Sequence, residues 1–211
     1  MPDPIPARDA AFPPGATALL LVDMQRIWLD PAYAEDQDHA DFYHETAAVT
    51  VPNCKALVAA ARASGVEVLH TIIQSLTEDG RDRSLDHKMT PIHLARSDPR
   101  GLPVLSLMPA GDEIMLPKTS SGVFNSTNID YVLRNLGVRT LVVCGIMTDQ
   151  CVDMAVRDAA DRGYVVVVPA DACFAATRAR HEQALSAFGG YCWRTDTATV
   201  ADRFRKMRER A

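Results

Sequence analysis

Residues 139–163, RTLVVCGIMTDQCVDMAVRDAADRG, join a short apolar strand to an amphipathic helix. The run that ends at Gly145 is nearly continuous in apolar residues, which is typical of a strand covered on both faces of a parallel sheet. From Thr148 onward the apolar residues recur at helical spacing, and we expect Thr148 to cap this helix and Gly163 to end it. The stretch therefore predicts one repeat of a parallel α/β sheet.

The same alternation extends in both directions along the chain. Predicted strands cover 17–23, 66–74, 113–118, 139–145, 164–170 and 191–196, and predicted helices cover 44–65, 127–137, 148–163 and 177–190, with a last helix beyond residue 196. This order predicts a three-layer α/β/α fold around a six-stranded, mainly parallel sheet. Ligands of such sheets bind at the carboxyl ends of the strands.

Two stretches depart from this alternation. The first fifteen residues contain five prolines, so we expect residues 1–15 to form an arm and residues 16–211 to form a single domain. Residues 75–112 show no sustained period, and a loop of this length in a compact domain is typically functional or a subunit contact.

The composition argues against several classes of protein. The formal net charge is −5 and charges of both signs are interspersed, which disfavours nucleic acid as a partner. The longest apolar runs are far too short to span a membrane, and the N-terminus lacks the features of a signal peptide. The five cysteines are odd in number and have no close pairs, so we expect reduced thiols in the cytoplasm.

Three reactive side chains follow three different predicted strands. Asp23 ends the first strand, Lys118 ends the third, and Cys151 lies just past the fourth, in the first turn of a helix. We expect the positive end of that helix to lower the pKa of the Cys151 thiol. Each residue alone has a structural alternative, a buried cysteine above all. Together they supply a nucleophile, a cation that stabilises its thiolate and a carboxylate that carries its proton.

Three motifs resemble the isochorismatase-like cysteine hydrolases. They are LLLVDMQ at 19–25, LPKTSSGVFNST at 116–127 and GIMTDQCVDMAVRDAADRGY at 145–164. The resemblance extends over roughly residues 16–200, with the motifs in the order of the family, and the third motif is the most specific.

The resemblance implies a catalytic triad of Asp23 as general acid and base, Lys118 as its charged partner and Cys151 as nucleophile. It also implies a non-proline cis peptide between Ile146 and Met147, and an oxyanion hole formed by the backbone N–H groups of Met147 and Cys151. The implied reaction on a small-molecule amide is thiolate attack, loss of an amine or ammonia, and hydrolysis of the thioester. Family members commonly form dimers or tetramers, so we expect a homo-oligomer without a cofactor.

The absence of certain residues indicates which branch of the family the sequence resembles. Nicotinamidase-type members carry an acid and two histidines after the second strand as a metal site. Here HTIIQSLTEDGRDRSLDHK at 70–88 has His87 but no Asp-x-His pair, so we expect no metal. True isochorismatases lack the nucleophilic cysteine. The spacing Lys118-x-x-x-Gly122-x-Phe124 looks like the branch that acts on biuret, triuret or ureidoacrylate.

A linear ureido substrate of that kind needs several hydrogen-bonding partners and apolar walls. The predicted polar contacts are Gln74, Arg81, Asn125 and Gln150, and the predicted walls are Trp28 and Phe124. The first motif departs from the Asn-Asp-Phe type of many members, because a bulkier Trp28 stands in it. We therefore expect a narrower or differently shaped pocket.

Alternative functions are a nicotinamidase-like or N-carbamoylsarcosine amidase-like activity, or a non-catalytic binding scaffold of the same fold. A degenerate scaffold would have lost a member of the triad, and none is missing here. A dinucleotide-binding enzyme shares the alternation of strand and helix, but it needs a glycine-rich turn after the first strand. VDMQRI at 22–27 contains no glycine.

Overall fold

The computed structural model describes residues 5–33 and 40–208 and contains one parallel sheet. Its strands are β1 (Thr17–Val22), β2 (Glu67–Ile73), β3 (Ile114–Lys118), β4 (Thr140–Ile146), β5 (Val165–Pro169), β6 (Cys173–Phe174) and β7 (Trp193–Thr195). The strand order is β3-β2-β1-β4-β5-β7, with β6 paired to the end of β4. All six predicted strands are present, and the sequence did not predict the two-residue β6.

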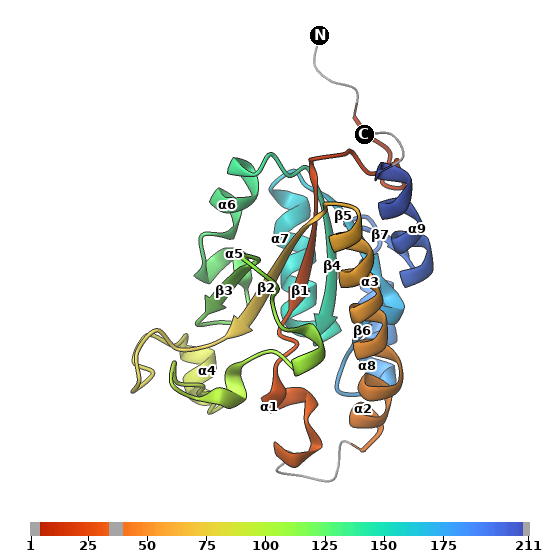
Figure 1. Ribbon diagram of the computed structural model, residues 1–211. Coiled ribbons are helices and arrows are strands. Elements are labelled where there is room, and N and C mark those ends of the chain that lie inside the picture. The colour runs from red at the N-terminus through yellow and green to blue at the C-terminus, as the bar shows by residue number, and fades with distance from the viewer. Residues whose placement is uncertain (1–4, 34–39, 209–211) are drawn as a thin grey trace.

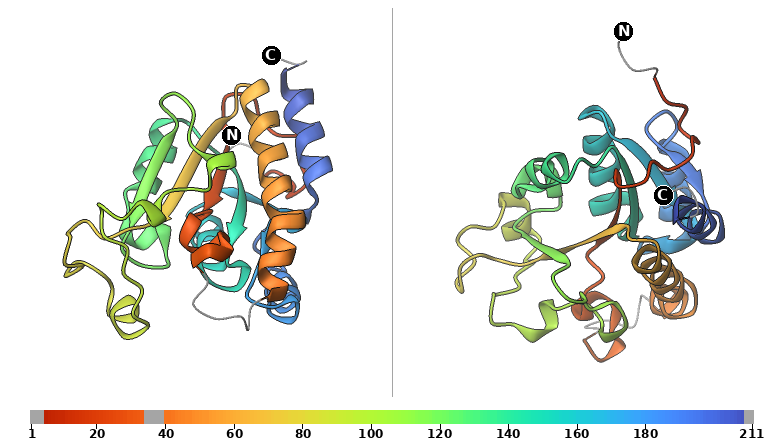
Figure 2. Two further views of the ribbon diagram at one scale, coloured as in Figure 1. Left: turned by 60° about the horizontal axis from the view of Figure 1, so that its bottom comes forward. Right: turned by 45° about the horizontal axis from the view of Figure 1, so that its top comes forward.

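Helices cover both faces of this sheet (Figure 1). They are α1 (Arg26–Leu29), α2 (Ala40–Glu45), α3 (Val51–Ala63), α4 (Leu85–Met89), α5 (Val123–Ser126), α6 (Ile129–Asn135), α7 (Asp153–Asp161), α8 (Arg178–Ala187) and α9 (Thr197–Arg208). Figure 2 shows α3 and α9 side by side on one face, with α6 and α7 on the other. The three-layer α/β/α prediction is confirmed.

Two predicted segments differ in detail from the structure. The helix predicted over 44–65 is divided by a π-helical turn at Thr46–Thr50, and α3 begins beyond it. Pro52 lies in the first turn of α3, directly after the π-helical turn, and has no backbone N–H to donate to it. The stretch 75–112, predicted as a loop, contains α4 and two short 3₁₀ turns, Pro99–Gly101 and Leu105–Leu107.

The first strand is buried along its whole length. All six residues of β1 are buried, because β2 and β4 flank the strand and helices cover both faces. Each leucine in TALLLV is at most 1% exposed, and full burial of such a side chain contributes about 1.5–3 kcal/mol relative to exposure. The chain that leaves β1 therefore starts from a rigid support.

A close approach between β1 and β4 fixes the carboxyl ends of these strands. Gly145 pairs with Val22 and has a φ of 123°, a conformation that only glycine adopts easily. A Cβ at this position would collide with the backbone of Val22. Glycine thus allows the segments after Val22 and Ile146 to leave the sheet side by side.

The carboxyl ends of the strands gather at one end of the molecule (Figure 1). Helices α1, α2 and α4 surround this end, whereas residues 5–16 and the end of α9 lie at the opposite end. Within the two described ranges, no helix is long and apolar enough to cross a membrane.

A buried histidine helps to attach α3 to the sheet. His70 in β2 is 2% exposed, and its Nε2 lies 3.1 Å from Oε2 of Glu113, which also pairs with Arg62 of α3. Burial lowers the pKa of His70, and Glu113 offsets this effect only in part. Burial opposes ionisation of Glu113, but hydrogen bonds from Arg62, Ala110 and His70 lower its pKa to about 2.

These shifts predict a loss of stability in mild acid. The unfolded chain takes up protons below the ordinary histidine pKa of about 6.5, whereas folded His70 resists them, so stability present above this pH is lost below it. The free energy of unfolding in urea should fall between about pH 7.5 and 5.5, and His70→Gln should fall less. Exposed His44 supplies the matched variant, His44→Gln, which should follow the wild type. An unchanged pH dependence in His70→Gln would contradict this account.

Candidate active site

Asp23 follows β1 in a conformation that is uncommon for a residue other than glycine. Its φ is 53°, and its side chain is almost fully buried. The Asp23 backbone N–H donates to the carbonyl of Thr71, and the Thr71 hydroxyl donates to Asp23 Oδ1 at 3.1 Å. Strand β2 therefore holds both the backbone and the carboxylate of Asp23 in place.

Lys118 ends β3 and is fully buried. Its Nζ lies 2.8 Å from Asp23 Oδ2 and donates to the carbonyl of Ser120 at 3.0 Å and to Cys151 Sγ at 3.4 Å. These three contacts use the three donors of an ammonium group. Burial alone would lower the pKa of Lys118, but the negative charge of Asp23, together with the contact to Cys151, outweighs burial, and the pKa lies above its ordinary value.

Cys151 lies in a π-helical turn, Thr148–Val152, which precedes α7 and is called the Cys151 turn below. The prediction that Thr148 caps an α-helix is wrong. Met147 occupies the cap position without a side-chain bond, and Thr148 Oγ1 instead lies 2.8 Å from His181 Nδ1 in α8. The predicted stop is confirmed, since α7 ends two residues before Gly163, which has a φ of 93°.

The predicted lowering of the Cys151 pKa is also wrong. Burial raises the pKa of this thiol to about 12, the negative charge of Asp23 adds to the rise, and Lys118 offsets only part of it. Cys151 is 5% exposed, so little water is present to solvate a thiolate. In the resting site the sulfur is a protonated thiol beside a carboxylate and an ammonium group.

The backbone before the Cys151 turn has an unusual geometry. The peptide bond between Ile146 and Met147 is cis, at the position that the resemblance implies. Strand β6 pairs with Gly145 and Ile146 on the side away from β1. The end of β4, from which the Cys151 turn leaves the sheet, is therefore held between β1 and β6.

A small chamber of about 80 Å³ lies over these residues. It is lined by Asp23, Trp28, Ile73, Ile92, Ile146, Met147, Gln150 and Cys151. Its walls are mainly apolar, and the carboxylate and the thiol are its reactive groups. This arrangement suits nucleophilic attack on a small neutral group.

Gln25 is a supporting residue that the sequence analysis missed. It is fully buried, and its side-chain amide bonds to the backbone N–H and carbonyl of Ile73 and to the carbonyl of Gly101. Its Oε1 also accepts a hydrogen bond from Trp28 Nε1 at 3.2 Å. An amide placed directly after a buried strand, in LLLVDMQ, was the available sign of this role.

Only two of the six predicted substrate contacts line the chamber, namely Trp28 and Gln150. Arg81 is exposed, pairs with Asp79 and does not line the chamber. Gln74 follows β2 but is not among the residues that line the chamber; its backbone N–H bonds to the carbonyl of Lys118.

The predicted wall at Phe124 and the predicted contact at Asn125 do not line the chamber either. Helix α5 buries Phe124 against the ring of Tyr164, at a centroid distance of 6.2 Å, and the guanidinium of Arg162 covers the Phe124 ring. Asn125 is exposed on the same helix. The spacing of the motif gave no information about which face of α5 meets α7.

His87 is buried in α4, and its Nε2 lies 3.3 Å from the hydroxyl of Ser121. Burial, followed by the charge of Lys118, lowers its pKa and favours the neutral ring. In the part of the chain that the structure describes, no three His, Cys, Asp or Glu side chains form a cluster that could hold a metal ion.

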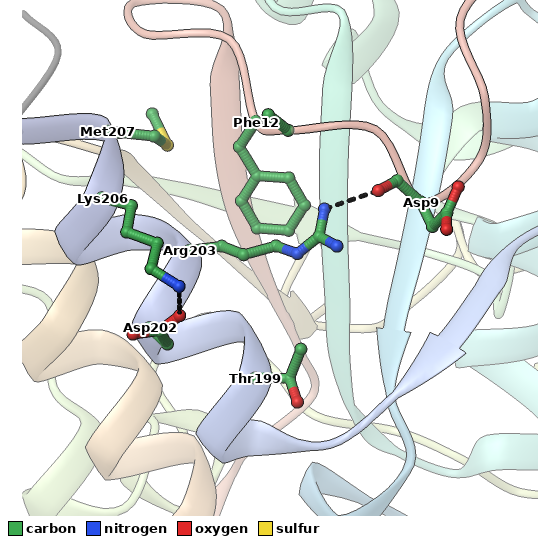
Figure 3. Close-up of a pocket in the computed structure, with 8 residues that line it drawn as sticks. Asp9, Phe12, Thr199, Asp202, Arg203, Lys206 and Met207 are labelled. Atoms are coloured by element: carbon green, nitrogen blue, oxygen red, sulfur yellow. Dashed lines mark hydrogen bonds and ion pairs between the residues drawn. The ribbon is translucent and has the colours of Figure 1, made fainter.

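Another cavity, of about 380 Å³, lies between the N-terminal segment and α9 (Figure 3). Arg203 there donates to the backbone carbonyl of Asp9, and Lys206 pairs with Asp202. It contains no cysteine and lies at the end of the sheet opposite to Asp23. We therefore place the chemistry in the chamber at Cys151.

The bond between Thr148 and His181 predicts a difference between two threonine variants. Thr148→Val removes the hydroxyl and leaves buried His181 Nδ1 without its partner, which should cost about 1–3 kcal/mol in the free energy of unfolding. Thr50 is equally buried, and its hydroxyl has no hydrogen-bond partner among the described residues, so Thr50→Val should be neutral or stabilising. Urea unfolding of both variants tests this, and equal losses would contradict it.

Comparisons with known proteins agree with this geometry. The model of the Isochorismatase domain matches residues 17–199. The ureidoacrylate amidohydrolase RutB of Serratia proteamaculans is 32% identical over 189 residues, which cover 80% of this chain and 74% of that protein. The enzyme of the same name from Agrobacterium fabrum is 33% identical over 190 residues, with coverage of 81% and 79%.

Solved structures of other proteins have the same fold. A cysteine hydrolase from Pseudomonas syringae pv. phaseolicola superposes with a TM-score of 0.84 at 27% identity, covering 98% of this chain and 100% of that one. N-carbamoylsarcosine amidase from Thermoplasma acidophilum, at 23% identity, shares the fold with a TM-score of 0.70 and coverage of 86% and 96%. The chain therefore belongs to the isochorismatase family, and it is a hydrolase.

Proposed function

We propose that the protein is a cysteine amidohydrolase that cleaves a carbon–nitrogen bond, other than a peptide bond, in a small ureido or carbamoyl compound. The observation that carries this proposal is the contact of Lys118 Nζ with both Asp23 Oδ2, at 2.8 Å, and Cys151 Sγ, at 3.4 Å. The relatives named ureidoacrylate amidohydrolase support the substrate class. Ureidoacrylate is accordingly the first compound to test.

In the first step, Cys151 attacks the carbonyl carbon of the bound amide. Its thiol is protonated at rest, so Asp23 takes the proton as the sulfur–carbon bond forms. The π electrons of the carbonyl move to oxygen, and the backbone N–H groups of Met147 and Cys151 bind the resulting oxyanion. Lys118 keeps its proton, holds the Asp23 carboxylate in place and offsets the charge that develops on sulfur.

In the second step, the carbon–nitrogen bond breaks. Protonated Asp23 returns the proton to the leaving nitrogen, the amine or ammonia departs, and an acyl thioester remains on Cys151. Asp23 then takes a proton from a water molecule that attacks the thioester carbonyl. Collapse of this second intermediate breaks the carbon–sulfur bond and releases the acid, and Asp23 returns its proton to the sulfur, so Asp23 serves in turn as base, acid, base and acid.

The proposal also includes a cytoplasmic location and assembly into a homo-oligomer, and features outside the chamber support both. All five cysteines are free and buried, as suits a cytoplasmic protein. The stretch 75–112 exposes large apolar side chains, which suits a contact in a homo-oligomer. These side chains are Leu76, Leu85, Met89 and Leu105.

Cys151→Ala and Cys151→Ser should lower kcat by roughly 10⁴-fold or more on ureidoacrylate or another accepted amide, because no other group can form the thioester. Both should unfold in urea near the wild-type midpoint. Cys192→Ala is the matched control, since Cys192 is also buried but lies outside the chamber. Retention of more than a few per cent of activity by Cys151→Ala would disprove the mechanism.

A further inference from the structure

The chamber at Cys151 adjoins a much larger cavity. This second cavity, called the vestibule below, has a volume of about 440 Å³, against about 80 Å³ for the chamber. Trp28, Ile92 and Met147 line both spaces, so the two lie side by side. A group bound at Cys151 can therefore extend into the vestibule.

The walls of the vestibule are predominantly apolar. They are formed by Ile27, Trp28, Tyr33, Phe42, Tyr43, Thr90, Pro91, Ile92, His93, Leu94, Arg100, Met147 and Ala176. Four of these residues are aromatic, and they come from the segment that contains α1 and α2, while Ile92 and Leu94 come from the stretch before β3. No acidic side chain is among the described residues that line this space.

The partition between chamber and vestibule is well supported. Trp28 stands where the two spaces meet, and its indole N–H bonds to Gln25. Gln25 is itself held by the backbone of Ile73 and Gly101. The position of Trp28 is therefore fixed by hydrogen bonds to a buried residue.

The two volumes bear on the size of the substrate. A single ureido or carboxamide group fills a space of about 80 Å³, whereas ligand sites for larger molecules typically have several hundred. A compound as small as biuret would occupy the chamber and leave the vestibule wet. Apolar groups bound there would bury the partly exposed side chains of Ile27, Tyr43 and Ile92.

We propose that the substrate carries an aromatic or branched aliphatic group on its ureido or carboxamide head, and that this group binds in the vestibule while the head lies at Cys151. The inference rests on the proposed function, because it takes Cys151 as the reacting group. It adds a requirement that the triad does not impose, namely an apolar substituent next to the amide.

Matched pairs of compounds test the inference by turnover. The pairs are acetamide with phenylacetamide and methylurea with benzylurea, and ammonia release gives kcat/KM for each. The benzyl member should exceed the methyl member by at least about tenfold in one pair. Equal values within both pairs, with activity that depends on Cys151, would overturn the inference and leave the proposed function intact.

Variants of residues that line the vestibule test whether the apolar substituent binds there. Ala176→Phe fills part of the space and Tyr33→Ala removes part of a wall, so both should bring the benzyl-to-methyl ratio towards one. Ala198→Phe, an exposed position on α9, is the matched control and should keep the wild-type ratio. A ratio unchanged in both vestibule variants, once each is shown to be folded, would overturn the inference.

Binding provides a readout that does not need turnover. In Cys151→Ala, phenylacetamide should bind at least about tenfold more tightly than acetamide by calorimetry, and Ala176→Phe should abolish the difference. Such binding without hydrolysis by the wild type would refute the proposed function alone. Equal binding of the two amides would refute the inference that the vestibule binds an apolar substituent.

Discussion

The buried ion pair between Asp23 and Lys118 is the interaction on which the rest of the site depends. The two side chains are 3% and 0% exposed and lie 2.8 Å apart. Removal of either partner would leave an uncompensated charge in the interior, at a typical cost of about 3–5 kcal/mol. The pair also links β1 to β3 across β2, whose Thr71 bonds to the Asp23 carboxylate. Sheet order and strand register therefore determine where the carboxylate and the ammonium meet.

This ion pair explains the protonated state of the nucleophile. Asp23 and Lys118 largely neutralise each other, so a thiolate at buried Cys151 would add a negative charge that Lys118 offsets only in part. The proton therefore stays on sulfur until a carbonyl is present to accept the developing charge. A buried thiol of this kind also resists oxidation, since oxidation follows thiolate character and exposure.

The sequence predicted the parts of the structure that follow from periodicity and topology. Strands β1, β4 and β5 are nearly continuous apolar runs, and Asp23, Lys118 and Cys151 meet because parallel strands end at one edge. The side chains around them were less predictable. The partner of Thr148 is His181, from α8, and nothing in the spacing of the Cys151 turn indicates a bond to a residue so far along the chain.

Tertiary packing, which the sequence pattern does not reveal, also explains why four of the six predicted substrate contacts do not line the chamber. Phe124 turned out to face Tyr164 because α5 packs against α7, a choice made by tertiary packing rather than by the motif. The vestibule is likewise built from segments that no local pattern connects, such as α2 and the stretch before β3. The supporting role of Gln25 was easier to predict from the sequence, since a buried amide after a buried strand needs partners for both its donor and its acceptor.

The state of the Cys151 thiol can be measured through its alkylation by iodoacetamide as a function of pH. Cleavage before Asp149 separates Cys151 from Cys144, so mass spectrometry of the resulting peptide follows Cys151 separately from the four other cysteines. With a thiol pKa of about 12, the rate should rise steadily from about pH 6 to 10 without a plateau. A plateau reached below about pH 8 would show a thiolate already formed beside Lys118, and would contradict the role of Asp23 as the base that takes the thiol proton.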